Sequence, residues 1–296
     1  MNLSFRRSIH NRETIAGYLF VSPVYIAFAL FILYPLARSV IMSFTMEGTN
    51  YVGWVGFKNY VAVFRDYAWW PSVKNTIIYS AVVVPAAIFI PFILAALIRI
   101  MKPAAQTFSK SCLYLPQVSS GLVMSLVWFW IYDPFNGLMN FLIGKVGLPP
   151  QIWLGDVNTA LLSLILMSVL AGHGSNTLLY IAAMGGIPNT LYEVARLEGA
   201  NWWQTVRNIT WPLLRPTVLY VLIMSIIGSF QVFTPAYVMT RGGPGLATST
   251  VVYKIFNDLF TYFSFGIATA EALMLALVII SISLIQFRFF ATDVEY

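Results

Sequence analysis

The sequence predicts an all-α, polytopic membrane protein with six transmembrane helices. Of its 296 residues, 59% are hydrophobic and only 9% are charged, a balance that an ordinary soluble domain does not show. Six segments run for about 20 residues or more almost without charge, and roughly 20 helical residues cross a bilayer core of about 30 Å. The runs are continuous rather than alternating, which argues against a membrane β-barrel.

The six expected spans are, in chain order, Ala16–Ala37, Asn75–Ile98, Ser111–Tyr132, part of Val157–Tyr192, Pro216–Thr240 and Leu259–Phe287. The first follows a basic stretch but is longer than the 7–15 apolar residues of a secretory signal, so we expect it to be retained. The last carries a single acid, Glu271. A transmembrane domain over residues 15–289 is therefore predicted, between an N-terminal segment (1–14) and a C-terminal tail (290–296).

The distribution of basic residues predicts the orientation, because cytoplasmic loops carry an excess of Lys and Arg. With the N-terminus inside, the cytoplasmic side holds Arg6, Arg7, Arg12, Arg99, Lys102, Lys110, Arg196, Arg207, Arg215 and Arg288. The outer side holds fewer: Arg38, Lys58, Arg65, Lys74, Lys145, Arg241 and Lys254. Both termini and the 189–213 loop are thus expected in the cytoplasm.

The 189–213 loop predicts two short helices joined by a turn. Thr190 and Glu193 have the spacing of a capping box, and Gly199 suits the left-handed residue that closes a helix. Asn201 is expected to cap the second helix, and Pro212 to end it. Such a helix pair between two spans is a device for docking a partner.

This loop resembles the cytoplasmic EAA loop of the membrane subunits of ATP-binding cassette (ABC) importers, whose pattern is Glu-Ala-Ala, three residues, Gly, nine residues, Ile, any residue, Leu-Pro. The matching positions are Glu193, Ala195, Gly199, Ile209 and Pro212. The sequence departs from the pattern at Val194 and Trp211, and has Glu198 where the sugar importers usually have Asp. The resemblance implies that the first helix sits in a cleft of an ATPase subunit, with Leu191, Ala195 and Leu197 as apolar contacts and Glu193 as a charge.

Other segments resemble the maltose-type sugar importers, specifically the permease half with an outer Gly-Gly-Pro turn. They are Gly56–Tyr60 with Asn75-Thr76, Gly137–Asn140, Thr240–Pro244 and Tyr262–Gly266, and the C-terminus lacks the G-A-x-K-G tail of the usual partner. The resemblance implies the type I importer permease fold in a bacterial or archaeal cytoplasmic membrane. It implies a second permease subunit, two nucleotide-binding ATPase subunits and an extracytoplasmic solute-binding protein as partners, besides membrane lipid. The solute would be a sugar or related compound.

The chain lacks the phosphate-binding loop that ATP hydrolysis requires. The nearest imitation, Gly137 to Lys145, has the wrong spacing and no following Ser or Thr. We therefore expect a non-catalytic subunit that binds no cofactor, with ATP and Mg²⁺ used by the partners. One cysteine, Cys112, excludes an internal disulfide and a Cys-based metal cluster, and no metal site is expected. The net charge of +6 comes mostly from inner loops, so nucleic acid is not an expected partner.

Polar and small residues within the spans are the candidates for a substrate pathway, because such groups are costly in lipid unless they face protein or water. They are Gln117, Ser168, Gly172, His173, Ser175, Asn176, Ser225, Ser229 and Glu271. Importers of the resembling family use the fourth and fifth spans for a midmembrane sugar site. Small residues four apart also let membrane helices pack closely, so both interpretations stay open.

Glu271 leaves three interpretations open: pairing with Arg38, contact with the partner permease, or proton coupling. The last defines the alternative function, an ion-coupled secondary transporter that uses Glu271 and His173. An intramembrane enzyme would need paired catalytic groups at one depth, and the two histidines, His10 and His173, fall far apart in the topology. The sequence does not specify the solute, the partner permease, or whether the ATPase is shared.

Overall fold

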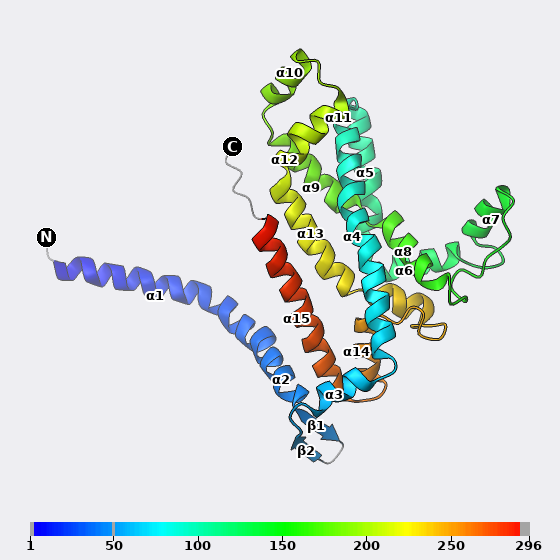
Figure 1. Cartoon of the computed structure of the whole chain (residues 1–296). Helices are drawn as coiled ribbons and strands as arrows, with labels where there is room; N and C mark the ends of the chain where they lie inside the picture. The colour runs from blue at the N-terminus through cyan, green and yellow to red at the C-terminus, as the bar shows by residue number, and fades with distance from the viewer. Residues whose placement is uncertain (1–2, 49–50, 291–296) are drawn as a thin grey trace.

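A computed structural model describes residues 3–48 and 51–290 and is almost entirely helical. Figure 1 shows an elongated bundle in which three long helices, α4 (Trp69–Arg99), α13 (Arg215–Phe230) and α15 (Phe265–Phe290), run roughly along the same axis. Short helices lie at one end, which we call the loop end: α10 (Asn189–Leu197), α11 (Trp202–Thr205) and α12 (Trp211–Leu213). The other end, which we call the hairpin end, contains a β-hairpin (β1, Thr45–Gly48, and β2, Tyr51–Trp54), α3 (Lys58–Arg65) and α14 (Val251–Phe260).

The first predicted span is one end-to-end helical segment that projects from the bundle (Figure 1). It comprises α1 (Leu3–Phe28), a π-helical turn (Ala29–Leu33) and α2 (Tyr34–Ser43). The segment Thr14–Ser43 is long and apolar enough to cross a membrane, and none of its most apolar stretch is buried within the chain. Only α2 packs on the body, against α15. Of the predicted N-terminal segment 1–14, the described residues 3–14 form the first part of α1.

The chain then forms a small antiparallel hairpin, which the all-α prediction did not include. Strand β1 (Thr45–Gly48) pairs with β2 (Tyr51–Trp54) so that Thr45 lies opposite Trp54. Aromatic residues pack on one another here: Phe44 stacks on Trp54 and meets Phe57 edge-on. Helix α3 (Lys58–Arg65) follows and leads into α4 (Trp69–Arg99), the second span.

The third span is not the single helix expected over Ser111–Tyr132. Helix α5 (Pro103–Val118) and α6 (Gly121–Ile131) meet at an angle of 98°. Two serines separate them in extended conformation, and the side chain of Ser120 caps α6 by accepting a hydrogen bond from the Val123 amide. A capping serine followed by glycine starts a new helix instead of continuing the old one.

The fourth span is also interrupted. Helix α7 (Leu138–Lys145) precedes it, and the span itself consists of α8 (Ala160–Ala171) and α9 (Gly174–Gly185), separated at Gly172 and His173. The backbone approaches closely here, since a Cβ on Gly174 would lie 2.2 Å from the Leu113 carbonyl oxygen of α5. The two breaks, in α5–α6 and in α8–α9, therefore lie against each other.

The remaining helices correct two further boundaries. They are α10 (Asn189–Leu197), α11 (Trp202–Thr205), α12 (Trp211–Leu213), α13 (Arg215–Phe230), α14 (Val251–Phe260) and α15 (Phe265–Phe290), with π-helical turns at Val206–Thr210 and Ala236–Thr240. The fifth span ends at Phe230 rather than Thr240, and the sixth begins at Phe265 rather than Leu259. Residues 291–296 of the tail lie outside the described residues.

Four described helical segments meet the length and hydropathy of a membrane span, and two bent pairs, α5–α6 and α11–α13, bring the number to six. Helix α4 is the central element, packing on α8, α9 and α13. Its Phe92 meets both Tyr180 of α9 and Trp211 of α12 edge-on. This buried aromatic contact joins the membrane helices directly to the loop end.

Candidate functional site

The 189–213 loop forms the helix–turn–helix that its sequence predicts, with one correction. Helix α10 begins after Pro188 without a side-chain cap, so the expected Thr190–Glu193 capping box does not form. Thr190 lies inside the helix, where its hydroxyl cannot reach the first amides. Gly199 closes α10 with φ +76°, as expected. Asn201 and Gln204 form a complete capping box on α11, with both bonds at 2.8 Å.

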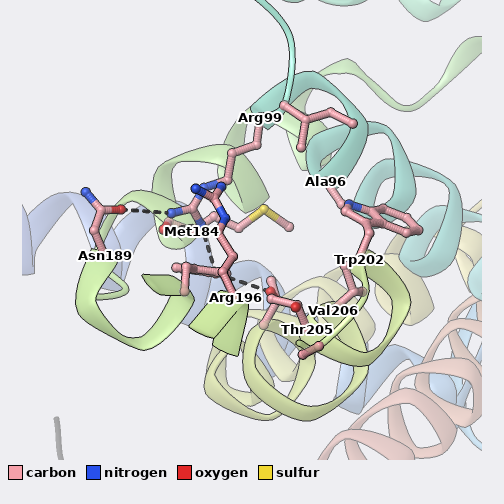
Figure 2. A pocket seen from close by; sticks show the side chains of 12 residues that line it. Ala96, Arg99, Met184, Asn189, Arg196, Trp202, Thr205 and Val206 are labelled. Atoms are coloured by element: carbon pink, nitrogen blue, oxygen red, sulfur yellow. Dashed lines mark hydrogen bonds between the residues drawn. The ribbon is translucent and has the colours of Figure 1, made fainter. Parts of the chain in front are cut away.

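A single arginine at the end of α4 fixes the loop on the membrane helices (Figure 2). Arg99 donates hydrogen bonds to the Met184 carbonyl and the Tyr192 hydroxyl, both at 2.9 Å. A longer contact of 3.5 Å reaches the side-chain oxygen of Asn189. The Tyr192 hydroxyl in turn bonds Thr210 at 3.2 Å. Helix α10 is thereby linked to α4, α9 and the start of the next span.

Helix α10 has two different faces. One faces inward and buries Ala195. The other presents large apolar side chains outward: Leu191, Val194 and Leu197 are 40%, 56% and 88% exposed. Of the other residues matched to the EAA pattern, Glu193 and Gly199 are exposed, whereas Ile209 and Pro212 are half-buried.

A cavity of about 350 Å³ opens where the two interrupted spans meet. Its lining includes three of the candidate pathway residues, Gln117, Ser168 and Gly172. Ser175 adjoins it, because its backbone amide and its hydroxyl both donate to the side-chain oxygen of Gln117. Ser168 hydrogen bonds the Tyr79 hydroxyl of α4 at 2.6 Å. The helix breaks thus gather amide and hydroxyl groups at one place between the two ends of the bundle.

The other candidates in the spans do not line this cavity. The side chain of Asn176 donates to the Ala87 carbonyl of α4 at 3.3 Å, and the Ser229 hydroxyl donates to the Ile226 carbonyl of its own helix at 3.1 Å. Ser225 is half-buried on α13. His173 contacts the Val169 carbonyl through Nε2. Each of these contacts satisfies a polar group within the helix bundle.

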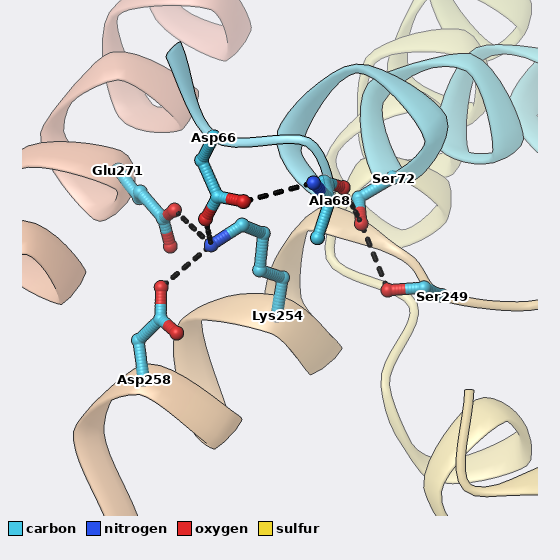
Figure 3. Close-up of polar contacts among 7 residues, drawn as sticks. All are labelled: Asp66, Ala68, Ser72, Ser249, Lys254, Asp258 and Glu271. Carbon is cyan, nitrogen blue, oxygen red and sulfur yellow. Dashed lines mark hydrogen bonds and ion pairs between the residues drawn. The ribbon is translucent and has the colours of Figure 1, made fainter. Parts of the chain in front are cut away.

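Glu271 belongs to a buried ion cluster near the hairpin end, where it pairs with Lys254 and not with Arg38, one of the three partners or roles left open above. Lys254 of α14 lies between three carboxylates, 2.6 Å from Asp66, 2.6 Å from Asp258 and 2.7 Å from Glu271 (Figure 3). The side chain of Glu271 is fully buried and that of Lys254 is 5% exposed. The cluster joins the α3–α4 connection, α14 and α15.

The electrostatics of the cluster follow from these distances. Burial works to lower the pKa of Lys254, but the three carboxylates outweigh it, Glu271 most strongly, and the pKa of Lys254 is raised. Burial likewise works to raise the pKa of Asp66, yet hydrogen bonds from Lys254 and the Ala68 amide hold that pKa below its ordinary value of 3.8. The three acids have oxygens within 4.8 Å of one another, a spacing that suits a metal ion. The Lys254 ammonium supplies the positive charge there.

Sequence reasoning missed the partners in both networks. Lys254 and Asp258 are four residues apart on one helix, a spacing that could have indicated an ion pair. Asp66 and Glu271 are far from them in the sequence, so the complete cluster had no local signal. In the sequence Arg99 is one of the basic residues expected near the cytoplasm, and only the fold brings it into contact with Tyr192.

Comparison with known proteins places the chain among membrane transport components. Residues 87–291 match the model of the family described as "Binding-protein-dependent transport system inner membrane component". The chain is 34% identical, over 96% of its length and 99% of the relative's, to a probable ABC transporter permease protein (YurN) of Bacillus subtilis. It is 30% identical, over 95% of its length and 90% of the relative's, to the arabinooligosaccharides transport system permease protein AraP of the same species.

The fold is shared with a protein of known structure. A bacterial ABC transporter involved in the import of the acidic polysaccharide alginate contains a chain that superposes with a TM-score of 0.87, covering 98% of this chain and all of that one at 22% identity. Superposition at this identity establishes the architecture, and the family match establishes the kind of protein. The chain therefore belongs to the family of binding-protein-dependent transport system inner membrane components and is an ABC transporter permease with the type I importer fold.

Proposed function

We propose that this chain is the non-catalytic half of a translocation pathway in an ATP-driven importer of a sugar or related solute. A second permease would form the other half, two nucleotide-binding subunits would use ATP and Mg²⁺, and an extracytoplasmic protein would deliver the solute. The loop end would face the cytoplasm, with both termini on that side. The family membership and the relatives that transport oligosaccharides support this assignment.

The exposed apolar face of α10 is the observation that carries the proposal. Leu197 is 88% exposed at the tip of a helix that is otherwise fixed to the membrane domain through Arg99 and Tyr192. An apolar face on a short, rigidly held helix gains free energy by entering a partner's cleft, since burial contributes about 25 cal/mol per Å². Motion of the partner would then pass through α10 and Trp211 to the packed core of α4.

The cavity at the two helix breaks is the proposed solute site within this chain. Hydroxyl groups of a sugar require hydrogen-bond partners, and Gln117 and Ser168 present an amide and a hydroxyl to a space of about 350 Å³. Ser175 would position Gln117 through its hydrogen bonds. Arabinooligosaccharide transport by one relative and alginate import by the structural neighbour favour a carbohydrate.

The two residues of the ion-coupled alternative do not lie together. Glu271 is fully buried and lies 2.7 Å from Lys254 in the ion cluster near the hairpin end. His173 is engaged with the Val169 carbonyl in a different part of the bundle.

The test of coupling is co-expression of the chain with its genomic neighbours, comparing wild type with Leu197→Asp and Glu193→Lys. We expect the wild-type chain to copurify with a nucleotide-binding subunit. Leu197→Asp should reduce that recovery or the solute-stimulated ATPase activity at least about tenfold, because a charge would enter an apolar cleft.

Phe135→Asp is the matched control, since Phe135 is also 88% exposed but lies outside the loop end. It should leave ATPase recovery unchanged. Solute uptake into vesicles by this chain alone, without ATP, would contradict the proposal.

The solute site is tested by uptake of a panel of sugars, with Gln117→Leu against Gln106→Leu of the same helix. Gln117→Leu should raise the apparent KM for the transported sugar, because one hydrogen-bonding group leaves the cavity. Gln106 lies outside the cavity lining and should leave that KM unchanged. Equal effects of the two substitutions would argue against the cavity as the solute site.

A further inference from the structure

A second cavity, of about 520 Å³, lies behind the 189–213 loop, between α10, α11 and the ends of α4 and α9 (Figure 2). The face of α10 that lines it carries Asn189, Tyr192 and Arg196, at positions three and four residues apart. The apolar face with Leu197, proposed above to meet the ATPase, is a different one. The cavity is therefore a separate space on the membrane side of α10.

Two guanidinium groups line this cavity, those of Arg99 and Arg196. Arg99 uses three hydrogen bonds to fix the loop, and a guanidinium has five N–H donors. Arg196 is exposed, and its side chain forms no ion pair or hydrogen bond with other described residues. The described lining contains no carboxylate. Two like charges beside an open cavity repel each other unless an anion lies between them.

The remaining walls suit a hydroxylated ring. Trp202 lines the cavity and is 41% exposed, so part of its ring is available for stacking. Thr205 lies one helical turn further on the same side and adds a hydroxyl group. Arginine is the side chain that recognises phosphate best, because its planar fork donates two parallel hydrogen bonds.

We propose that this cavity binds a phosphate-bearing molecule, with the phosphate between Arg99 and Arg196 and its attached hydroxylated group against Trp202. The ligand is a soluble sugar phosphate or the headgroup of an anionic phospholipid, which share this chemistry. The inference rests on the proposed function in placing the cavity in the cytoplasm and α10 against the ATPase. A ligand there wedges between α10 and the end of α4, and so changes the position of the helix that meets the ATPase.

The test uses the assembled transporter in nanodiscs of zwitterionic phosphatidylcholine and calorimetric titration with glucose 6-phosphate, inorganic phosphate and glucose. Glucose 6-phosphate should bind more tightly than inorganic phosphate. Arg196→Gln should weaken its binding about tenfold or more, since a charge-assisted pair is lost. Arg207→Gln is the matched control: Arg207 is an exposed arginine of the same loop that does not line the cavity, and its substitution should change nothing. Any binding of glucose should not depend on Arg196.

Repeating the titration in nanodiscs with phosphatidylglycerol separates the two sources. If phosphatidylglycerol competes with glucose 6-phosphate, and this competition disappears in Arg196→Gln, the lipid headgroup is an occupant of the cavity. If phosphatidylglycerol leaves the binding of glucose 6-phosphate undiminished, the ligand is the soluble sugar phosphate. The inference would be overturned if neither glucose 6-phosphate nor phosphatidylglycerol showed binding that depends on Arg196. It would also be overturned if Arg196→Gln and Arg207→Gln changed the binding equally. A transporter that couples ATP to uptake yet shows no such binding refutes the cavity alone. A permease pair that never recruits an ATPase refutes the proposed function, whatever it binds.

Discussion

Lys254 is the residue whose surroundings matter most for the stability of the hairpin end. Its ammonium lies within 2.7 Å of three carboxylates contributed by three different parts of the chain. A buried cation in this position offsets the repulsion among acids whose oxygens lie within 4.8 Å of one another. The Lys254 ion pairs therefore help to hold α14 on α15.

Replacing Lys254 with methionine tests this view. The Lys254→Met variant should lose roughly 3–5 kcal/mol of unfolding free energy, because it leaves buried carboxylates without their cation. Thermal unfolding in detergent measures the loss. Lys58→Met, at an exposed lysine nearby, is the control and should change little. Adding Glu271→Gln to Lys254→Met should recover part of the lost stability, because it removes one of the unpaired carboxylates. If Lys254→Met were as stable as the control Lys58→Met, the cluster would not be structural.

Asp66 predicts a pH dependence. Its pKa is below 3.8 in the folded protein, so ionised Asp66 stabilises the fold above that pH, and the contribution is lost as the pH falls through the folded-state pKa. Asp66→Asn should accordingly be less stable than wild type near neutral pH, and the gap should narrow below pH 3.8. Unfolding followed by tryptophan fluorescence at several pH values measures it, and a gap independent of pH would contradict the assignment.

At the scale of elements, the breaks in the third and fourth spans produce the cavity. Each break is a place where a span ends one helix and starts another: Ser120 caps α6, and Gly174 begins α9. Gly174 lets α9 approach the α5 backbone so closely that Gln117 and Ser175 form hydrogen bonds across the contact. Uninterrupted helices would have carried these side chains past each other.

Gly174→Ala should disturb this contact. Its Cβ would lie 2.2 Å from the Leu113 carbonyl oxygen, so α5 and α9 must separate, at a cost of about 1–3 kcal/mol. Gly185→Ala, at the other end of α9, has no atom within 4 Å of the new Cβ and should be neutral or slightly stabilising. Thermal unfolding of the two variants provides the comparison, and a Gly174→Ala variant as stable as Gly185→Ala would show that the helices can move apart freely.

At the scale of the whole molecule, the chain has two chemically different ends. The loop end presents an apolar helix face and arginines, and the hairpin end holds the buried ion cluster and stacked aromatic residues. The proposed orientation places the first in the cytoplasm and the second outside.

Cysteine labelling in a Cys112→Ser background tests this orientation, because Cys112 is exposed in the wild type. Leu197→Cys and Phe135→Cys introduce thiols at positions that are both 88% exposed. In cells that express the permease without its ATPase, an impermeant maleimide should label Phe135→Cys directly and Leu197→Cys only after permeabilisation. The reverse labelling pattern would show that the chain has the opposite orientation in the membrane.

The sequence by itself determined the class of the protein, the approximate positions of the six spans and the helix–turn–helix of the 189–213 loop. Long apolar runs need a bilayer, and Gly199 and the Asn201–Gln204 box act through neighbouring residues, so these signals are local. The resemblance of this loop to that of ABC importer permeases likewise rested on residues close together in the sequence.

Only the tertiary structure decided what the polar residues contact. Thr190 and Glu193 had the spacing of a capping box, yet α10 begins earlier, at Asn189 directly after Pro188, and its Tyr192 accepts a hydrogen bond from Arg99 of α4. Glu271 pairs with Lys254 rather than Arg38 because the fold returns α14 beside α15. Such contacts join residues distant in the sequence, and their free energy depends on burial and geometry that composition and spacing do not contain.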